Sequence, residues 1–145
     1  MDDRKIGLEL RALHNTLARY TAHHKKRPPV EMTEMHAEIL GFLLKAEGEV
    51  ILQKDIEQVF TIRKSTASRM LQLIERKGLI ERVATKEDAR QKQIVLTEKA
   101  HNLRNKMETE TDKLEKTVKT GISDEDLDIF FKVIEQIKEN LRIDK

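Results

Sequence analysis

Apolar residues recur at helical spacing along most of this chain, and the pattern is interrupted between residues 79 and 96. Steps of three and four residues place side chains on one helix face, because an α-helix turns once in about 3.6 residues. Such stripes open and close the chain: Ile6, Leu10, Leu13, Leu17 and Tyr20, then Leu127, Phe130, Phe131, Ile134, Ile137 and Leu141. The interruption contains two short runs typical of strands, at residues 79–83 and 93–96. The spacing therefore predicts a mainly α-helical fold with a small β-hairpin.

Proline, glycine and capping residues divide the helical pattern into segments. Pro28-Pro29 ends the first helix, since proline lacks an amide donor and disfavours helix in the residue before it. Thr33, Thr97 and Ser123 each stand where a side-chain oxygen can cap the helix that follows. The glycines that end helical segments are Gly48, Gly78 and Gly121. The expected order is four helices, the hairpin and two more helices.

Two helices in the middle of the chain are joined by a short turn at residues 61–62. The first covers residues 53–60 and is expected to point Ile56, Val59 and Phe60 inward. The inward residues of the second are Ala67, Met70, Leu71 and Ile74. Helices joined in this way form a helix-turn-helix candidate. With the hairpin behind it, residues 33–96 are predicted to be a winged helix-turn-helix DNA-binding domain.

The first and last helices carry more apolar surface than the small central domain can cover. Exposed apolar surface of that size is typical of an interaction face. We therefore expect residues 1–32 and 97–145 to form a helical dimerisation region that packs against a second copy of the chain. The residues expected at that interface are Ile6, Leu10, Phe130, Ile134, Ile137 and Leu141.

The charge of the chain is small overall but unevenly distributed. The formal net charge is +2, yet residues 1–30 carry +4, residues 31–60 carry −5, residues 61–92 carry +5 and residues 93–145 carry −2. A basic block between acidic ones is an electrostatic footprint for nucleic acid that the average conceals. This block coincides with the second helix of the helix-turn-helix and with the hairpin.

The start of that second helix is rich in groups that contact DNA. A helix of this kind can enter the major groove with its first turns facing the base edges. Basic side chains supply charge-assisted hydrogen bonds, hydroxyls bond phosphates or base edges, and the helix N-terminus itself attracts phosphate. The candidate contacts are Arg63, Lys64, Ser65, Thr66, Ser68 and Arg69. An ordinary capped helix with polar residues facing solvent is the alternative interpretation.

The charged stretch between the two strands is the second candidate contact. An arginine at a hairpin tip can enter the minor groove, where the negative potential is strongest. Asp88, two residues before Arg90, is suited to hold its guanidinium by paired hydrogen bonds. The wing candidates are Lys86, Asp88, Arg90 and Lys92. The alternative is a charged, exposed turn without a partner.

Four segments in order resemble the MarR family of bacterial and archaeal winged-helix transcription regulators. They are STASR at residues 65–69, LIERKGLIER at residues 73–82, DAR at residues 88–90 and VLTEKA at residues 95–100. Each segment is short, but their order and spacing together are specific to the family. The resemblance is greatest between about residue 53 and residue 100, and the outer helices match in position and length.

The resemblance implies a homodimer that places two recognition helices and two wings on a pseudo-palindromic operator. Family members mostly repress promoters, and many release DNA on binding a small aromatic or lipophilic effector. Carried onto matching positions, the DNA contacts are Ser65, Thr66, Ser68 and Arg69 on the helix, and Asp88 with Arg90 in the wing. An effector cleft is expected among Leu13, Leu17, Tyr20, Ile39, Phe42, Leu103 and Met107, residues that at helical spacing also fit a plain core.

The sequence departs from the family pattern at four positions near the helix-turn-helix. Arg63 stands where a capping Asp or Ser is common, so that helix start loses a cap and gains a charge. Thr61 replaces a frequent glycine of the turn, and Leu52 and Glu57 replace a capping residue and a small residue of the preceding helix. These changes affect local cap geometry and operator sequence, and leave the expected fold intact.

Several function classes are disfavoured by what the sequence lacks. It has no cysteine, which excludes a disulfide framework, a thiol nucleophile and a cysteine-based sensor. No serine lies in a glycine-rich elbow and no glycine-rich phosphate loop is present, so we expect neither an enzyme nor a cofactor. No apolar run is long enough to span a bilayer and the first residues do not resemble a signal peptide, so we expect a cytoplasmic protein without membrane contact.

Two other functions of the same fold remain open. A metal-responsive regulator would use residues near the junction of the outer helices with the winged domain: His14, His23, His24, Glu31, His36 and His101. No pair of histidines has the spacing that places both on one helix face as metal ligands, so no metal site is assigned. The other possibility is a winged-helix module that contacts proteins and does not bind DNA specifically.

Overall fold

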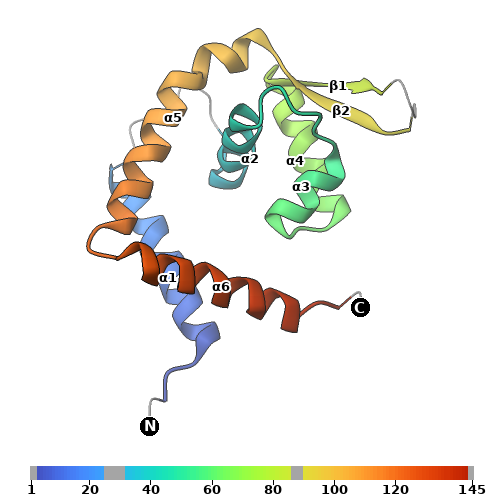
Figure 1. Cartoon of the computed structure of the whole chain (residues 1–145). Helices are drawn as coiled ribbons and strands as arrows, with labels where there is room; N and C mark the ends of the chain where they lie inside the picture. The colour runs from blue at the N-terminus through green and yellow to red at the C-terminus, as the bar shows by residue number, and fades with distance from the viewer. Residues whose placement is uncertain (1–2, 25–31, 86–89, 144–145) are drawn as a thin grey trace. The chain divides into compact units, whose positions relative to one another are not determined.

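The computed structural model describes residues 3–24, 32–85 and 90–143, and these residues form six helices and one hairpin (Figure 1). The elements are α1 (Ile6–His24), α2 (Glu34–Lys45), α3 (Gln53–Phe60), α4 (Lys64–Arg76), β1 (Ile80–Ala84), β2 (Lys92–Leu96), α5 (Glu98–Lys119) and α6 (Asp124–Asn140). This order confirms the predicted fold class, a mainly α-helical chain with a β-hairpin wing behind a helix-turn-helix.

The chain divides into two compact units, residues 1–40 and residues 41–145. The boundary falls inside α2, so the first unit contains α1 and the start of α2, and the second contains every later element. The division into a winged domain at residues 33–96 and flanking dimerisation segments stays a prediction.

The core of the second unit is built from one face of each central element. Its α4 residues follow the expected helical spacing, and Ala67, Leu71 and Ile74 are at most 1% exposed. The other buried apolar residues of this unit are Leu43, Leu44, Ile51, Ile56, Leu79, Ile80, Ile94 and Ala100. In the first unit, Ile39 and Leu40 are fully buried.

One core prediction for α3 is wrong. Ile56 is fully buried, but Val59 is 49% exposed. A step of three residues turns a helix about 60° short of a full circle, whereas a step of four overshoots it by only about 40°. Phe60 therefore stays closer to the face of Ile56, and its ring meets that of Phe42 edge to face with centroids 6.0 Å apart.

The hairpin is anchored at its base and exposed farther out. Its strands pair in antiparallel register from Ile80 with Leu96 to Ala84 with Lys92. In the middle of β2, the Ile94 amide donates to the Ile51 carbonyl at 2.8 Å, which adds the backbone preceding α3 to the edge of β2. The wing is therefore attached to the helix-turn-helix through backbone hydrogen bonds.

Three helices begin with the caps that the sequence predicts, and at α2 the Thr33 hydroxyl accepts a hydrogen bond from the His36 amide at 3.4 Å. The Thr97 hydroxyl accepts a hydrogen bond from the Ala100 amide at 3.3 Å, and the Ser123 hydroxyl accepts one from the Asp126 amide at 3.1 Å. Each satisfies an amide that the helix itself leaves without a partner. These caps fix where α5 and α6 begin.

The first turn of α5 is bonded to the end of α4. The Thr97 hydroxyl donates to the Gly78 carbonyl at 2.6 Å, and the Thr97 amide donates to the Leu79 carbonyl at 3.1 Å. The Lys99 ammonium donates to the Lys77 carbonyl at 2.8 Å. These three bonds satisfy carbonyls that follow the last helical turn of α4, where the chain reverses at Gly78 with a φ of +75°.

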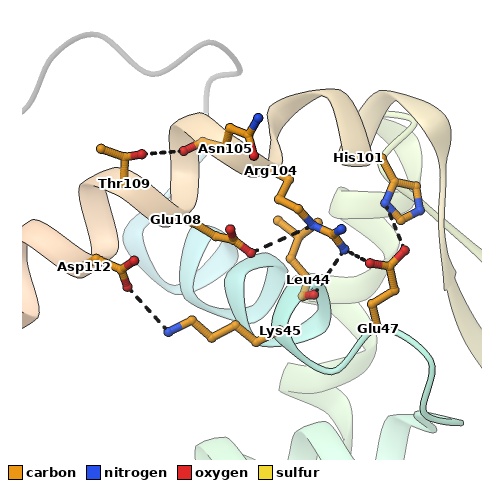
Figure 2. A network of polar contacts seen from close by, with 9 residues as sticks. All are labelled: Leu44, Lys45, Glu47, His101, Arg104, Asn105, Glu108, Thr109 and Asp112. Carbon is orange, nitrogen blue, oxygen red and sulfur yellow. Dashed lines mark hydrogen bonds and ion pairs between the residues drawn. The ribbon is translucent and has the colours of Figure 1, made fainter.

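A second set of polar contacts joins α5 to the segment that ends α2 (Figure 2). The Arg104 guanidinium donates to the Glu47 carboxylate and, at 3.4 Å, to the Leu44 carbonyl. The Lys45 ammonium lies 3.9 Å from the carboxylate of Asp112, about two turns beyond Arg104 along α5. Residues 99–112 of α5 are thus joined by side-chain contacts to the end of α2 and to the segment that follows α4.

The outer helices differ from this core. Neither α1 nor α6 contains a buried residue. Within the part of the chain that the structure describes, no helix combines the length and apolar character that a membrane crossing requires.

Candidate nucleic-acid interface

The six residues predicted to contact DNA through the helix lie at the start of α4, outside its buried face. Arg63, Lys64, Ser65 and Arg69 are exposed, and Thr66 and Ser68 are half-buried. The opposite face of α4 is the one that enters the core. The fold therefore brings these residues together on one accessible end of one helix.

That end of α4 has no side-chain cap. Arg63 occupies the cap position in an extended conformation, and its side chain makes no cap hydrogen bond. The first amides of a helix have no acceptor within the helix and carry partial positive charge. Because Arg63 and Lys64 add full positive charges there, this end is suited to bind an anion such as a phosphate group. The predicted loss of a cap in exchange for a charge is confirmed.

The turn between α3 and α4 adopts a conformation that glycine normally supplies. Thr61 has φ +52° and ψ +52°, and it is the one non-glycine residue with positive φ in the described part of the chain. A β-branched side chain is strained in this region of backbone space. The Ile62 amide donates to the Glu57 carbonyl at 3.0 Å, so the turn is held closed despite that strain.

Two side chains that the sequence did not single out define the start of each helix. At α3, Leu52 provides no cap, but the Asp55 carboxylate accepts a hydrogen bond from the Leu52 amide at 2.8 Å. The Gln53 side-chain amide donates to the Lys64 carbonyl at 3.3 Å, linking the two helix starts. This contact joins the first residue of α3 to the first residue of α4.

The wing prediction is covered in part by the described residues. Arg90 and Lys92 are exposed. Lys86 and Asp88 lie outside the described residues, so the pairing of Asp88 with Arg90 stays a prediction.

An ion pair between α4 and β1 escaped the sequence reasoning. The Arg82 guanidinium donates to the Glu75 carboxylate at 3.1 Å. This hydrogen bond lowers the pKa of the Glu75 carboxyl below its ordinary value, with a further contribution from the charge of Lys92 on β2. Glu75 and Arg82 lie in different elements on either side of a turn, so neither the helical nor the strand period relates them.

The predicted dimer residues are accessible in the single chain. Ile6 is 62% exposed, Leu10 is 42%, Phe130 is 46% and Leu141 is 71%, while Ile134 and Ile137 are half-buried. Side chains of this kind are available to a partner surface. Dimerisation through them stays a prediction.

A cavity of about 270 Å³ lies in the second unit, beside the segment that joins α2 to α3. It is lined by residues 43, 46–51, 93–96 and 101, and its polar side includes Glu47 and His101, whose side chains lie 3.4 Å apart. None of the seven residues predicted for an effector cleft lines it. Of those seven, Ile39 is buried, Phe42, Leu103 and Met107 are half-buried, and Leu13, Leu17 and Tyr20 are exposed.

The structure describes five of the six candidate metal ligands. Among these residues, no three His, Asp or Glu side chains form a group that could hold a metal ion. His36 contacts the Thr33 hydroxyl, and His24 contacts the Tyr20 carbonyl at 3.1 Å. Burial, followed by the charge of Glu34, raises the pKa of the Glu38 carboxyl, and nearby His14 opposes the shift. Glu31 lies outside the described residues.

The sequence model of the MarR family matches residues 31–91, which include the helix-turn-helix and β1. Solved structures of the family extend the likeness to the outer helices. The transcription regulator MarR from Oenococcus oeni PSU-1 is 28% identical over 93% of this chain and 99% of its own, with a TM-score of 0.80. Residues 31–91 of the chain thus resemble the MarR family. The chain has the fold of the MarR-family transcription regulators.

Two other MarR-like structures contain ligands. MepR from S. aureus, solved in complex with DNA, is 21% identical over 96% of this chain and 100% of its own, with a TM-score of 0.75, a likeness that concerns the fold. The heme sensor PefR from Streptococcus agalactiae, solved with heme, is 28% identical over 99% of this chain and 97% of its own, with a TM-score of 0.60. The chain thus shares its fold with one protein solved on DNA and another solved with heme.

Proposed function

We propose that this protein is a sequence-specific regulator of the MarR family that binds double-stranded DNA as a homodimer. The observation that supports this most directly is the uncapped, basic start of α4, exposed on the side opposite the core. An anion-binding helix end with hydroxyls and Arg69 one turn away has the chemistry for phosphate contact and base recognition in the major groove. Arg90 in the wing adds a cation suited to the minor groove.

The outer helices support the homodimer part of this proposal. Both α1 and α6 lack buried residues while carrying large apolar side chains. A second copy would cover them and would present two recognition helices related by two-fold symmetry, which favours a pseudo-palindromic operator. Binding to such an operator at a promoter blocks transcription, so we propose that the protein acts as a repressor.

Release by a small effector is the regulatory part of this proposal. PefR, at 28% identity, was solved with heme, an aromatic and lipophilic molecule. We therefore propose an effector of the aromatic or lipophilic class. Titration of the protein–DNA complex with hemin and with a small phenol tests both ends of that class, and release of DNA by either one is the expected result.

The DNA proposal is tested on the tightest duplex selected from a random-sequence library. We expect Arg69→Ala to cost about 1–3 kcal/mol of binding free energy, concentrated at particular base pairs, because an arginine at this point can read base edges. Arg90→Ala should weaken binding without changing dimer mass or melting temperature, since the side chain is exposed. Fluorescence anisotropy gives both affinities.

Salt dependence separates a DNA-binding regulator from a protein-interaction module. Neutralisation of several phosphates releases counterions, so affinity should fall steeply between about 50 and 200 mM salt. Selection that enriches no sequence, or weak binding indifferent to salt, would contradict the proposal. Zinc added during the same titration tests the metal-responsive alternative, for which operator affinity would change with the metal.

A further inference from the structure

Glu75 on α4 pairs with Arg82 on β1 of the wing. Arg82 belongs to the strand pair that is farthest from the base of the hairpin among those with a buried side chain. Arg82 pairs in register with Ile94, which is 5% exposed, and farther out Val83, Ala84 and Lys92 are exposed. The apolar core therefore holds the hairpin only as far as this strand pair. At that point the recognition helix itself offers a carboxylate to the strand.

Glu75 lies close to cations on both strands of the wing. Its carboxylate accepts from Arg82 on β1 at 3.1 Å, and the charge of Lys92 on β2 adds to the lowering of its pKa. The Arg82 side chain is only 22% exposed, which limits screening by solvent and favours a single geometry. Glu75 is in the last turn of α4, so the contact runs from the helix proposed for the major groove to the hairpin proposed for the minor groove.

We propose that Glu75 is a positioning residue, which through Arg82 fixes the angle between the wing and the recognition helix and thereby places Arg90 on DNA. The inference rests on the proposed function, since it assigns how one DNA contact is oriented relative to the other. It adds a residue that touches no DNA to the determinants of operator binding.

A small change of the hairpin's angle at the Glu75–Arg82 pair moves residues near its tip by a larger distance. Arg90 precedes Ile94 by four residues, so it lies up to about 13 Å beyond the pair along an extended strand. A tilt of ~10° at the pair then moves Arg90 by ~2 Å, which is more than a hydrogen bond to DNA tolerates. A small loss of order at Glu75 is therefore amplified at the wing.

Glu75→Gln tests this proposal because its charge effect and its positioning effect change DNA affinity in opposite directions. The substitution removes a negative charge near the DNA surface, and charge alone predicts tighter binding. The positioning role predicts the reverse, a loss of about threefold to tenfold in affinity for the selected duplex. The matched control is Glu81→Gln, which removes the same charge from an exposed position of β1 and should bind as tightly as the unchanged protein or more tightly.

A double-mutant cycle with Arg90→Ala separates positioning of the wing from a general structural effect. Once Arg90 is gone, the wing angle no longer matters to that contact, so Glu75→Gln should cost little further affinity. In an Arg69→Ala background the cost of Glu75→Gln should persist in full. Equal losses in the wild-type and Arg90→Ala backgrounds, or tighter binding of Glu75→Gln, would overturn the proposal.

Arg82→Lys provides a second route if Glu75→Gln melts early. It keeps the charge and loses the planar guanidinium, so affinity should fall by a similar factor with the same dependence on Arg90. Failure of the unchanged protein to bind any selected duplex would instead refute the proposed function, and the two outcomes are therefore distinct.

Discussion

The central helices and the two outer helices have the same helical periodicity of apolar residues but differ in how far those residues are buried. On α4, the periodic residues Ala67, Leu71 and Ile74 are buried within the single chain. On α6, residues with equally regular spacing stay open to solvent, and α1 is the same. Periodicity tells which face of a helix is apolar, whereas burial tells whether the chain itself supplies the surface that covers it. The central helices bury their apolar faces within the single chain, whereas α1 and α6 leave theirs exposed.

The largest loss of stability is expected when a buried side chain of α4 is shortened. Leu71→Ala should lower the free energy of unfolding by about 2–5 kcal/mol, because Leu71 is fully buried and its neighbours can fill the space only in part. Urea denaturation followed by circular dichroism measures this loss. Val59→Ala on α3 is the control, since its side chain is half exposed and should cost far less. Equal losses for the two variants would break the comparison.

A change of intermediate size is expected in dimerisation when the apolar face of an outer helix is altered, and it should depend on protein concentration. Phe130→Asp places a carboxylate on the apolar face of α6 and should convert the proposed dimer into a monomer at tens of micromolar, as analytical ultracentrifugation would record. Lys132→Asp introduces the same carboxylate on the polar side of the helix and should leave the mass unchanged. A monomeric unchanged protein would show that α1 and α6 need no second copy.

The smallest change is expected at the strained turn between α3 and α4, where a substitution should stabilise the protein. Thr61→Gly should raise the free energy of unfolding by about 0.5–1 kcal/mol, since glycine adopts positive φ without the penalty that a β-branched residue incurs. Thr117→Gly, inside α5, should destabilise by the usual cost of glycine in a helix. Thermal unfolding of both variants measures the contrast. A loss at Thr61 would mean that the turn derives its geometry from the threonine side chain.

Sequence reasoning performed best where local chemistry decides the structure. The predicted helix at residues 53–60 coincides with α3, and the caps at Thr97 and Ser123 were predicted from residue type. The exposed basic start of α4 followed from the same local logic. These features depend on neighbours within about four residues, which the sequence displays directly.

It performed worst for contacts between different helices and strands. The contacts of Glu75 with Arg82, of Gln53 with the Lys64 carbonyl, and of Lys99 with the Lys77 carbonyl have no shared period. Each depends on how two elements pack, which burial of the whole core determines. Val59 illustrates the same limit, since a short helix gives too few periods to fix which of its apolar residues turns inward.

The two ends of α4 are unlike in a way that bears on local unfolding. Helix ends ordinarily fray first, and hydrogen exchange begins there. At its C-terminal end, the hydroxyl and amide of Thr97 and the ammonium of Lys99 bond the carbonyls that follow the last turn, so that this end and the first turn of α5 open together or not at all. At the end with Arg63 and Lys64 no side chain caps the helix, so its first amides are expected to exchange first. Amide protection should therefore rise along the helix from its basic end to its bonded end.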